Sequence, residues 1–219
     1  MRLVLPRLYV ILDAALLTSP EKEFAGKMAD AGVRLMQYRY KGASSRELLR
    51  VSRELCETLV PRGVTLLVND RGDVAALSGA SGVHVGQEDI SVESARAVVG
   101  PEKLVGISTH NLEQFRMAAA SSADYIAVGP IFSTSTKQNP DPVVGTNFLK
   151  QVRPHTNKPI VAIGGITLER ASEVLAAGAD SLAVISDILL ARDPAAHAKK
   201  YLDLLGAAND AATSERSDE

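Results

Sequence analysis

The sequence lacks tryptophan, and aromatic residues make up only 4% of its 219 positions, against 46% hydrophobic residues. We therefore expect a sizeable core built from aliphatic side chains and alanine. Cys56 is the only cysteine, which excludes an internal disulfide and is typical of a reducing compartment. Its helical spacing within residues 47–59 favours a packing role over nucleophilic chemistry.

A strong charge of one sign and long apolar runs are missing as well. The formal net charge at pH 7 is −2, which argues against nucleic acid or an anionic membrane as the main partner. No apolar stretch is long enough to span a bilayer, and we expect no secretory signal peptide at the N-terminus. These features predict a cytoplasmic protein whose partners are small molecules.

What the chain does contain is a series of short apolar runs separated by segments with helical periodicity. The runs cover residues 8–13, 35–40, 65–70, 82–86, 104–108, 125–130, 159–165 and 181–186. The clearest helix covers residues 47–59, where Ser44 and Glu47 resemble a capping box. Eight strand-then-helix units predict one α/β domain, a (β/α)8 TIM barrel, whose active site lies at the C-terminal ends of the strands.

The expected boundaries follow from the same pattern. We expect the barrel to occupy residues 1–206, with a last helix that opens at Ser186 or Asp187 and ends near Leu205. Residues 207–219 are small and polar, which predicts a disordered tail. The longest stretch without periodicity covers residues 132–145, and its position after the sixth run predicts an active-site lid.

Cationic side chains crowd the end of the second run. Because side chains alternate along a strand, Gln37, Arg39 and Lys41 share one side. The other side carries the residues expected to pack against helices, Met36, Tyr38 and Tyr40. A partly buried cation needs a partner, which an anionic ligand or a structural carboxylate could supply. The pattern leaves both readings open.

Two aspartates follow neighbouring strands. Asn69 and Asp70 end the third run, and Asp89 comes just after the fourth. Adjacent strand ends can bring both carboxylates together, and oxygen ligands without a His or Cys pair suit Mg²⁺. Each aspartate alone could instead cap a helix. Their place beside Arg39 and Lys41 favours the metal.

The last two runs end in a way that suits a phosphate group. Gly165 ends the seventh run, and Ile185 and Ser186 end the eighth. A phosphate site commonly follows strands seven and eight of this barrel, where backbone N–H groups at helix N-termini face an anion. Tight turns without a ligand are the alternative.

The fifth run and the predicted lid add hydroxyl groups. Ser108 could bond a phosphate or a ring nitrogen, whereas His110 suits a structural role because no acidic third member completes a hydrolase triad. In the lid, Thr134, Thr136 and Lys137 suit phosphate, although a solvated polar loop would look the same. The clusters together indicate two anion sites on one barrel mouth, one for a diphosphate and one for a monophosphate.

Seven short motifs, in order along the chain, resemble the thiamine-phosphate synthase family. They are QYRYK (37–41), VND (68–70), HVGQED (84–89), GISTH (106–110), GPIFSTSTK (129–137), IGGI (163–166) and AVIS (183–186). The family joins 4-amino-2-methyl-5-(diphosphooxymethyl)pyrimidine to a thiazole phosphate, giving thiamine phosphate and pyrophosphate. Position 133 is Ser where the family often has Pro.

The resemblance also implies roles for individual residues. The pyrimidine diphosphate would be held by Gln37, Arg39, Lys41, Asn69, Ser108 and Lys137. The thiazole phosphate would be held by Thr134, Ser135, Thr136, Gly165, Ile185 and Ser186. Mg²⁺ would be bound by Asp70 and Asp89. The second-strand motif adds Tyr38 and Tyr40 to the substrate-binding candidates, and the catalytic candidates are Arg39, Lys41, Ser108 and Lys137.

Three other functions stay open at this point. A barrel that tautomerises a thiazole phosphate would need the monophosphate site without the diphosphate machinery. A non-catalytic thiamine-phosphate-binding protein would keep the pocket but not turn over. A phosphosugar isomerase would bind one phosphate and ignore Mg²⁺. A homo-oligomer is compatible with each of these functions.

Overall fold

Parallel strands close into a barrel in chain order. The computed structural model describes residues 3–134, 136 and 141–214. In this part of the chain the barrel strands are β1 (Leu8–Asp13), β2 (Leu35–Arg39), β3 (Thr65–Asn69), β4 (Gly82–Val85), β5 (Leu104–Thr109), β6 (Tyr125–Val128), β7 (Ile160–Ile163) and β8 (Ser181–Val184). Each strand pairs in parallel with the next, and β8 pairs with β1. The predicted (β/α)8 barrel is confirmed.

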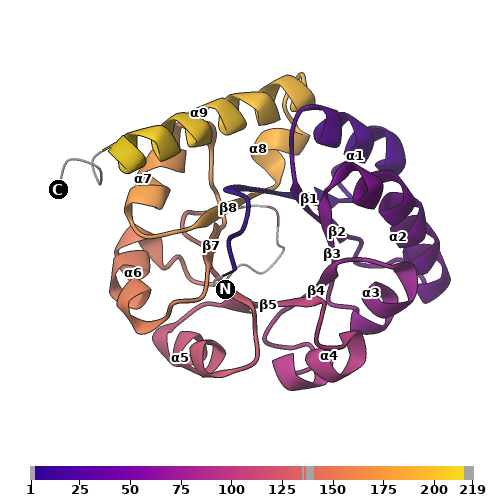
Figure 1. Cartoon of the computed structure of the whole chain (residues 1–219), viewed down its shortest axis with the longest axis horizontal. Coiled ribbons are helices and arrows are strands. Elements are labelled where there is room, and N and C mark those ends of the chain that lie inside the picture. The colour runs from indigo at the N-terminus through magenta and orange to yellow at the C-terminus, as the bar shows by residue number, and fades with distance from the viewer. Residues whose placement is uncertain (1–2, 135, 137–140, 215–219) are drawn as a thin grey trace.

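Helices surround the barrel as an outer ring (Figure 1). They are α1 (Glu21–Asp30), α2 (Ser45–Leu59), α3 (Gly72–Ser78), α4 (Val92–Val99), α5 (Leu112–Ala120), α6 (Gly145–Val152), α7 (Ala171–Ala176), α8 (Ser186–Leu189) and α9 (Pro194–Ser214). Short 3₁₀ turns follow α2 and α6 and precede α7, at Val60–Arg62, Arg153–His155 and Leu168–Arg170. Ser44 caps α2 as predicted, since its side chain accepts a hydrogen bond from the Glu47 N–H at 3.2 Å. Within the described residues, no helix is both long and apolar enough to cross a membrane.

The end of the chain differs from the prediction. The expected single helix from Ser186 is two helices, α8 and α9, because Pro194 has no N–H to continue a helix and instead opens a new one. The Asp193 side chain accepts a hydrogen bond from the Ala196 N–H at 3.0 Å and caps α9. α9 continues to Ser214, past the predicted end near Leu205. The division into a domain of residues 1–206 and a tail of residues 207–219 stays a prediction.

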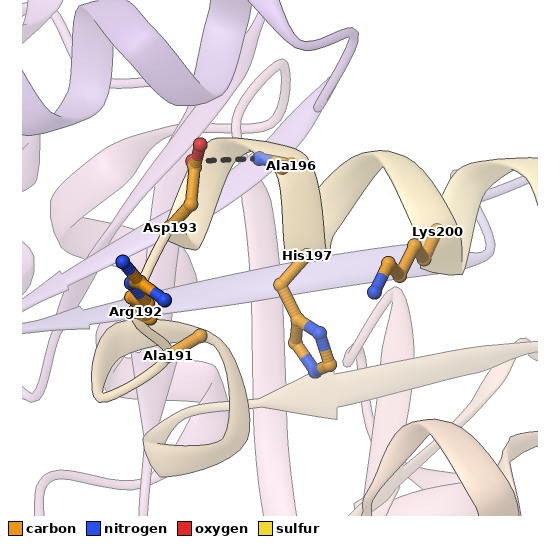
Figure 2. A pocket seen from close by; sticks show the side chains of 6 residues that line it. All are labelled: Ala191, Arg192, Asp193, Ala196, His197 and Lys200. Carbon is orange, nitrogen blue, oxygen red and sulfur yellow. Dashed lines mark hydrogen bonds between the residues drawn. The ribbon is translucent and has the colours of Figure 1, made fainter.

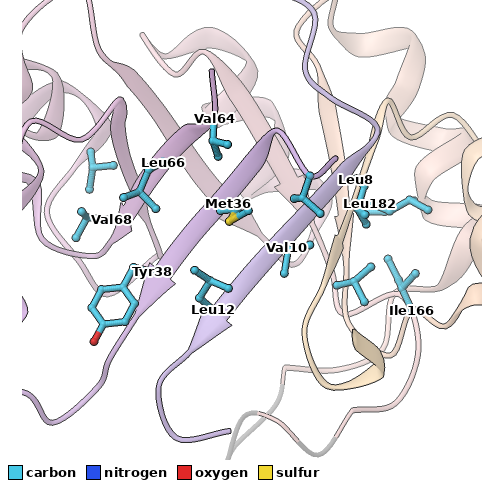
Figure 3. Close-up of a cluster of buried hydrophobic side chains, with 14 of the residues drawn as sticks. Leu8, Val10, Leu12, Met36, Tyr38, Val64, Leu66, Val68, Ile166 and Leu182 are labelled. Carbon is cyan, nitrogen blue, oxygen red and sulfur yellow. The ribbon is translucent and has the colours of Figure 1, made fainter. Parts of the chain in front are cut away.

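Two layers of apolar packing follow from the alternation of side chains along the strands. Outward residues such as Val10, Met36 and Leu66 meet the helices in one large cluster (Figure 3). Inward residues form a smaller cluster along the barrel axis, made of Leu5, Tyr9, Ile11, Leu35, Leu67, Tyr125, Ala127, Val161 and Ala183. The inner layer fills the barrel, so ligands must meet the protein at the strand ends.

Candidate active site

The end of β2 carries the first functional group of the site. Gln37 and Arg39 face inward, as the alternation predicts. Arg39 donates a hydrogen bond to the Asp13 carboxylate, which stands opposite it in the register of β1 and β2. Asp13 is buried, with 3% of its surface exposed, whereas the Arg39 side chain is 20% exposed. The sequence pattern left the partner of Arg39 open, and Asp13 was not predicted.

The two tyrosines of the same segment lie elsewhere. Tyr38 is fully buried between the barrel and the helices, where its hydroxyl donates to Glu21 at 3.2 Å. Burial and the nearby Glu21 charge raise the pKa of this phenol well above its usual range. Alternation along β2 turns this side chain away from the barrel axis, and the place of Tyr38 among the substrate-binding residues stays a prediction. Tyr40 is 38% exposed and packs edge-to-face on Tyr38, with ring centroids 6.5 Å apart.

The loops after β3 and β4 bring two carboxylates together. Asp70 adopts a left-handed backbone, with φ of 63°, and its N–H donates to the His84 carbonyl at 2.7 Å. Asp89 lies beside it and accepts a hydrogen bond from the Gly86 N–H at 2.7 Å. The pKa of Asp70 is raised to about 6, mainly by burial and also by the neighbouring Asp89 carboxylate. The predicted convergence is therefore present.

Lys41 and Asn69 lie next to this carboxylate pair. The Lys41 ammonium is 3.6 Å from an Asp70 carboxylate oxygen, and its side chain is 59% exposed. Asn69 ends β3, two residues after the inward-facing Leu67, and its amide therefore points to the same side. The described residues contain no group of three or more His, Cys, Asp or Glu side chains arranged to hold a metal. A cation here would have two protein carboxylates as its ligands.

A buried chain of polar side chains crosses the barrel beneath this rim, and most of its members were not predicted from the sequence. The Ser108 hydroxyl lies 2.8 Å from His84 Nε2, and the Tyr125 hydroxyl lies 2.8 Å from His84 Nδ1. Tyr125 continues to Tyr9 at 3.2 Å, and Tyr9 accepts a hydrogen bond from Gln37 at 2.7 Å. The signal in the sequence was a side chain with a polar group at an inward position of an apolar run, as at Tyr9, His84 and Tyr125.

His84, the histidine in this row of polar side chains, is uncharged. His84 is 7% exposed, and burial lowers its pKa to about 4, although the Asp89 charge acts in the opposite direction. Its ring stacks on Tyr125 with centroids 5.5 Å apart. A neutral imidazole has one N–H and one lone pair, so it can connect two hydroxyl groups in a defined direction.

The ends of β6 and β7 form the opposite side of the rim. Gly165 has φ of 62°, and a Cβ there would lie 2.4 Å from the Ser133 carbonyl oxygen, so glycine is needed on both counts. The segment after β6 pairs with this turn, since the Phe132 N–H donates to the Gly164 carbonyl at 3.0 Å. Arg170 joins the two segments: it donates to the Gly165 carbonyl at 2.8 Å and lies 4.5 Å from the centre of the Phe132 ring.

Ile185 and Ser186 connect β8 to α8 beside the glycine turn. The next residue, Asp187, was not predicted as part of the site but holds it in place. One oxygen of Asp187 accepts hydrogen bonds from the Leu168 N–H at 3.3 Å and from the Tyr201 hydroxyl at 2.7 Å, and it lies 2.8 Å from His197 Nε2. This carboxylate therefore ties the turns after β7 and β8 to α9.

The predicted lid is described in part. The Thr134 hydroxyl accepts a hydrogen bond from the Thr136 N–H at 3.3 Å, a local turn within the loop. Ser135 and Lys137 lie outside the described residues. His110 has the structural contacts expected of it, with Nδ1 2.6 Å from the Gly129 carbonyl and Nε2 3.5 Å from Asp141.

A cavity of about 450 Å³ lies at the start of α9 (Figure 2). It is lined by Ala191, Arg192, Asp193, Ala196, His197 and Lys200. None of the residues predicted from the sequence lines it. The candidate site is the open rim at the C-terminal ends of the strands, where the predicted residues meet.

Comparison with known proteins shows which proteins this chain is similar to. The family model described as thiamine monophosphate synthase matches residues 8–188. A thiamine-phosphate synthase of Koribacter versatilis is 53% identical over 209 residues, covering 93% of this chain and 97% of the relative. One from Chloroflexus aurantiacus is 42% identical, covering 91% and 92%. The solved thiamine phosphate pyrophosphorylase from Pyrococcus furiosus is similar with a TM-score of 0.83 and 32% identity, covering 92% of this chain and 96% of that one.

Proposed function

The chain belongs to the thiamine monophosphate synthase family, and from that premise we propose that it joins the pyrimidine diphosphate to the thiazole phosphate at the rim described above. The observation that carries the proposal is the division of this rim. Two cations and two carboxylates lie at the ends of β2, β3 and β4, whereas a glycine turn and a hydroxyl-bearing helix start lie at the ends of β7 and β8. One side suits a diphosphate with a divalent cation, and the other suits a monophosphate.

On the first side, Arg39 and Lys41 bind the diphosphate. Asp13 holds the Arg39 guanidinium in one orientation, so that its free N–H groups can meet phosphate oxygens as a fork. Lys41 supplies a second positive charge from an exposed side chain. Lys137, on the lid, is proposed to add a third. Charges placed before the reaction stabilise the negative charge that develops on the leaving group.

Asp70 and Asp89 fit Mg²⁺ by their chemistry. Two adjacent carboxylates repel each other, which is the origin of part of the raised pKa of Asp70, and a divalent cation would relieve that repulsion. Mg²⁺ takes few protein ligands and completes its shell with water and phosphate oxygens. When bound, it supplies Lewis-acid neutralisation of the diphosphate.

On the second side, the thiazole phosphate meets backbone N–H groups and hydroxyls. The turn at Gly165 and the start of α8 at Ser186 present their N–H groups to the same rim, and Thr134 and Thr136 add hydroxyls from the loop. Asp187 and Arg170 keep these segments together. Such a cradle binds a phosphomonoester without a dedicated cation.

The proposed reaction needs no protein nucleophile. The C–O bond between the pyrimidine methylene and the diphosphate breaks, and its electron pair leaves with the diphosphate. The electron-rich pyrimidine carries the positive charge until the thiazole nitrogen lone pair forms the new C–N bond. The chain contributes by holding both substrates in line and by neutralising the leaving group.

The test is to mix both substrates with the full chain, with and without Mg²⁺, and to assay pyrophosphate and thiamine phosphate. We expect equal amounts of both products, dependent on Mg²⁺ and strongly reduced in Asp70→Ala. Asp30→Ala removes an exposed aspartate far from the rim and is the matched control. Binding of thiamine phosphate without turnover would indicate a non-catalytic binding protein, and a changed thiazole without pyrophosphate would indicate a tautomerase. Cytoplasmic location and assembly into a homo-oligomer stay predictions.

A further inference from the structure

The polar chain inside the barrel has a direction. It begins at Gln37, whose Nε2 has hydrogens and no lone pair and therefore donates to the Tyr9 oxygen. The next links are Tyr9 with Tyr125, Tyr125 with His84 Nδ1, and His84 Nε2 with Ser108. Each tyrosine has a single hydroxyl proton, and the neutral imidazole has a single N–H, so each of these groups can donate only one hydrogen bond.

Counting protons along the chain selects one arrangement. Tyr9 accepts from Gln37 and sends its own proton to Tyr125. Tyr125 then donates to His84 Nδ1, which leaves the imidazole proton on Nε2. In the reverse arrangement Tyr9 would accept from both neighbours, and its buried proton would have no acceptor among the described residues. Leaving a buried hydroxyl unpaired is unfavourable, because the group loses its hydrogen bond to water and gains none in the protein.

We propose that this row of hydrogen bonds fixes Ser108 as a hydrogen-bond donor to the substrate, and that Tyr125 and His84 are the residues that position the Ser108 hydroxyl. His84 Nε2–H donates to the Ser108 oxygen, so the Ser108 proton is turned away from the ring. Ser108 is partly exposed at the C-terminal end of β5, beside the proposed diphosphate side of the rim. The inference deepens the proposed function and rests on it for the identity of the substrate.

The direction has a chemical consequence. A hydroxyl that donates meets a lone pair, which the pyrimidine diphosphate offers on its ring nitrogens and phosphate oxygens. It does not meet the exocyclic amino group, whose N–H bonds need an acceptor. The barrel interior thus selects which atom of the substrate Ser108 contacts, although Tyr9 and Tyr125 touch no substrate themselves.

The first experiment reads the proton on His84 directly. The full chain is labelled with ¹⁵N-histidine, and the ring nitrogens are observed by NMR near neutral pH without substrates. The chain has four histidines, and the His84 signals are assigned by their loss in His84→Gln. We expect a pyrrole-type signal for Nε2 and a pyridine-type signal for Nδ1. The opposite pattern, with the proton on Nδ1, would overturn the proposal.

The second experiment tests the coupling between Tyr125 and Ser108. Tyr125→Phe removes only the hydroxyl and should shift the His84 ring signals and lower kcat/KM for the pyrimidine diphosphate about 3- to 10-fold. In the Ser108→Ala background the same change should have no further effect, because the residue being positioned is gone. Independent, multiplicative losses would refute positioning.

A control and a separation of outcomes complete the test. Thr109→Val removes a buried hydroxyl from the same strand, on the opposite face, where it donates to the Ala127 carbonyl at 2.9 Å. It should leave the His84 signals unchanged. The NMR result does not depend on turnover. A protein without synthase activity would refute the proposed function, but the position of the His84 proton would still decide the direction of the hydrogen bonds. If Tyr125→Phe does not fold, the NMR pattern of the unsubstituted chain still decides.

Discussion

Asp70→Asn should stabilise the free protein and inactivate it. The wild-type pair of Asp70 and Asp89 places two carboxylates side by side, and burial together with the Asp89 charge disfavours the charged form of Asp70. Asparagine keeps the shape of the side chain and tolerates the left-handed backbone at φ of 63°. The substitution therefore removes the charge without straining the loop.

The size of the effect follows from the pKa. Raising the pKa of Asp70 from 3.8 to about 6 corresponds to about 3 kcal/mol of stability, at about 1.4 kcal/mol per pH unit. The folded protein holds this proton more tightly than the unfolded chain. The contribution of this proton to the free energy of unfolding is thus fully present below about pH 4, falls as the pH rises, and is lost above about pH 6. Because the side chain is 23% exposed and solvent screens the repulsion, we expect Asp70→Asn to gain roughly 1–2 kcal/mol near pH 8.

The assay is urea unfolding at about pH 8 and about pH 4.5 in the presence of a chelator. The advantage of Asp70→Asn should shrink at the lower pH, where the wild-type Asp70 is protonated in the folded state. Asp30→Asn, on an exposed side chain, should change the free energy of unfolding by less than about 0.5 kcal/mol. An Asp70→Asn protein that is no more stable than wild type near pH 8 would show that neither burial nor the neighbouring Asp89 destabilises the charged form of Asp70 in the folded protein.

Removing or adding the metal gives the complementary result. At about 100 times its Kd, Mg²⁺ should raise the free energy of unfolding of the wild type by about 2.7 kcal/mol. Asp70→Asn should show little of this gain, because one of the two proposed ligands has lost its charge. Equal stabilisation of both proteins by Mg²⁺ would place the cation elsewhere.

Three further predictions concern the packing of the glycine turn and of the core. Gly165→Ala places a Cβ 2.4 Å from a backbone oxygen and should lower the free energy of unfolding, measured by chemical denaturation, by about 1–3 kcal/mol. Gly206→Ala, whose added Cβ has nothing within 4 Å, is the control and should be neutral or slightly stabilising. Arg170→Ala should raise the KM for the thiazole phosphate about tenfold through a loosened glycine turn, and an equal rise for the pyrimidine diphosphate would contradict this. Leu55→Ala, fully buried, should lower the free energy of unfolding by about 2–5 kcal/mol, whereas Leu77→Ala, 62% exposed, should change it by less than about 0.5 kcal/mol in the same assay.

The alternation of residues along β2 was enough to predict that Gln37 and Arg39 face the barrel axis. The same rule predicted that Tyr38 packs against the helices, where the structure places it. The meeting of Asp70 and Asp89 was also predictable, because neighbouring parallel strands end at one rim. These are local or nearest-neighbour properties, and hydrophobic period and strand order already contain them.

Pairings between distant segments were decided only when the barrel closed. Asp13 reaches Arg39 across β1 and β2, and Tyr9 reaches Tyr125 across the interior, 116 positions along the chain. Asp187 gathers the turn after β7 and α9 through a single carboxylate oxygen. The sequence alone determined which side chains lie at the rim. Which distant polar groups pair with each other was decided by the tertiary structure, because the register and curvature of the closed sheet bring them together.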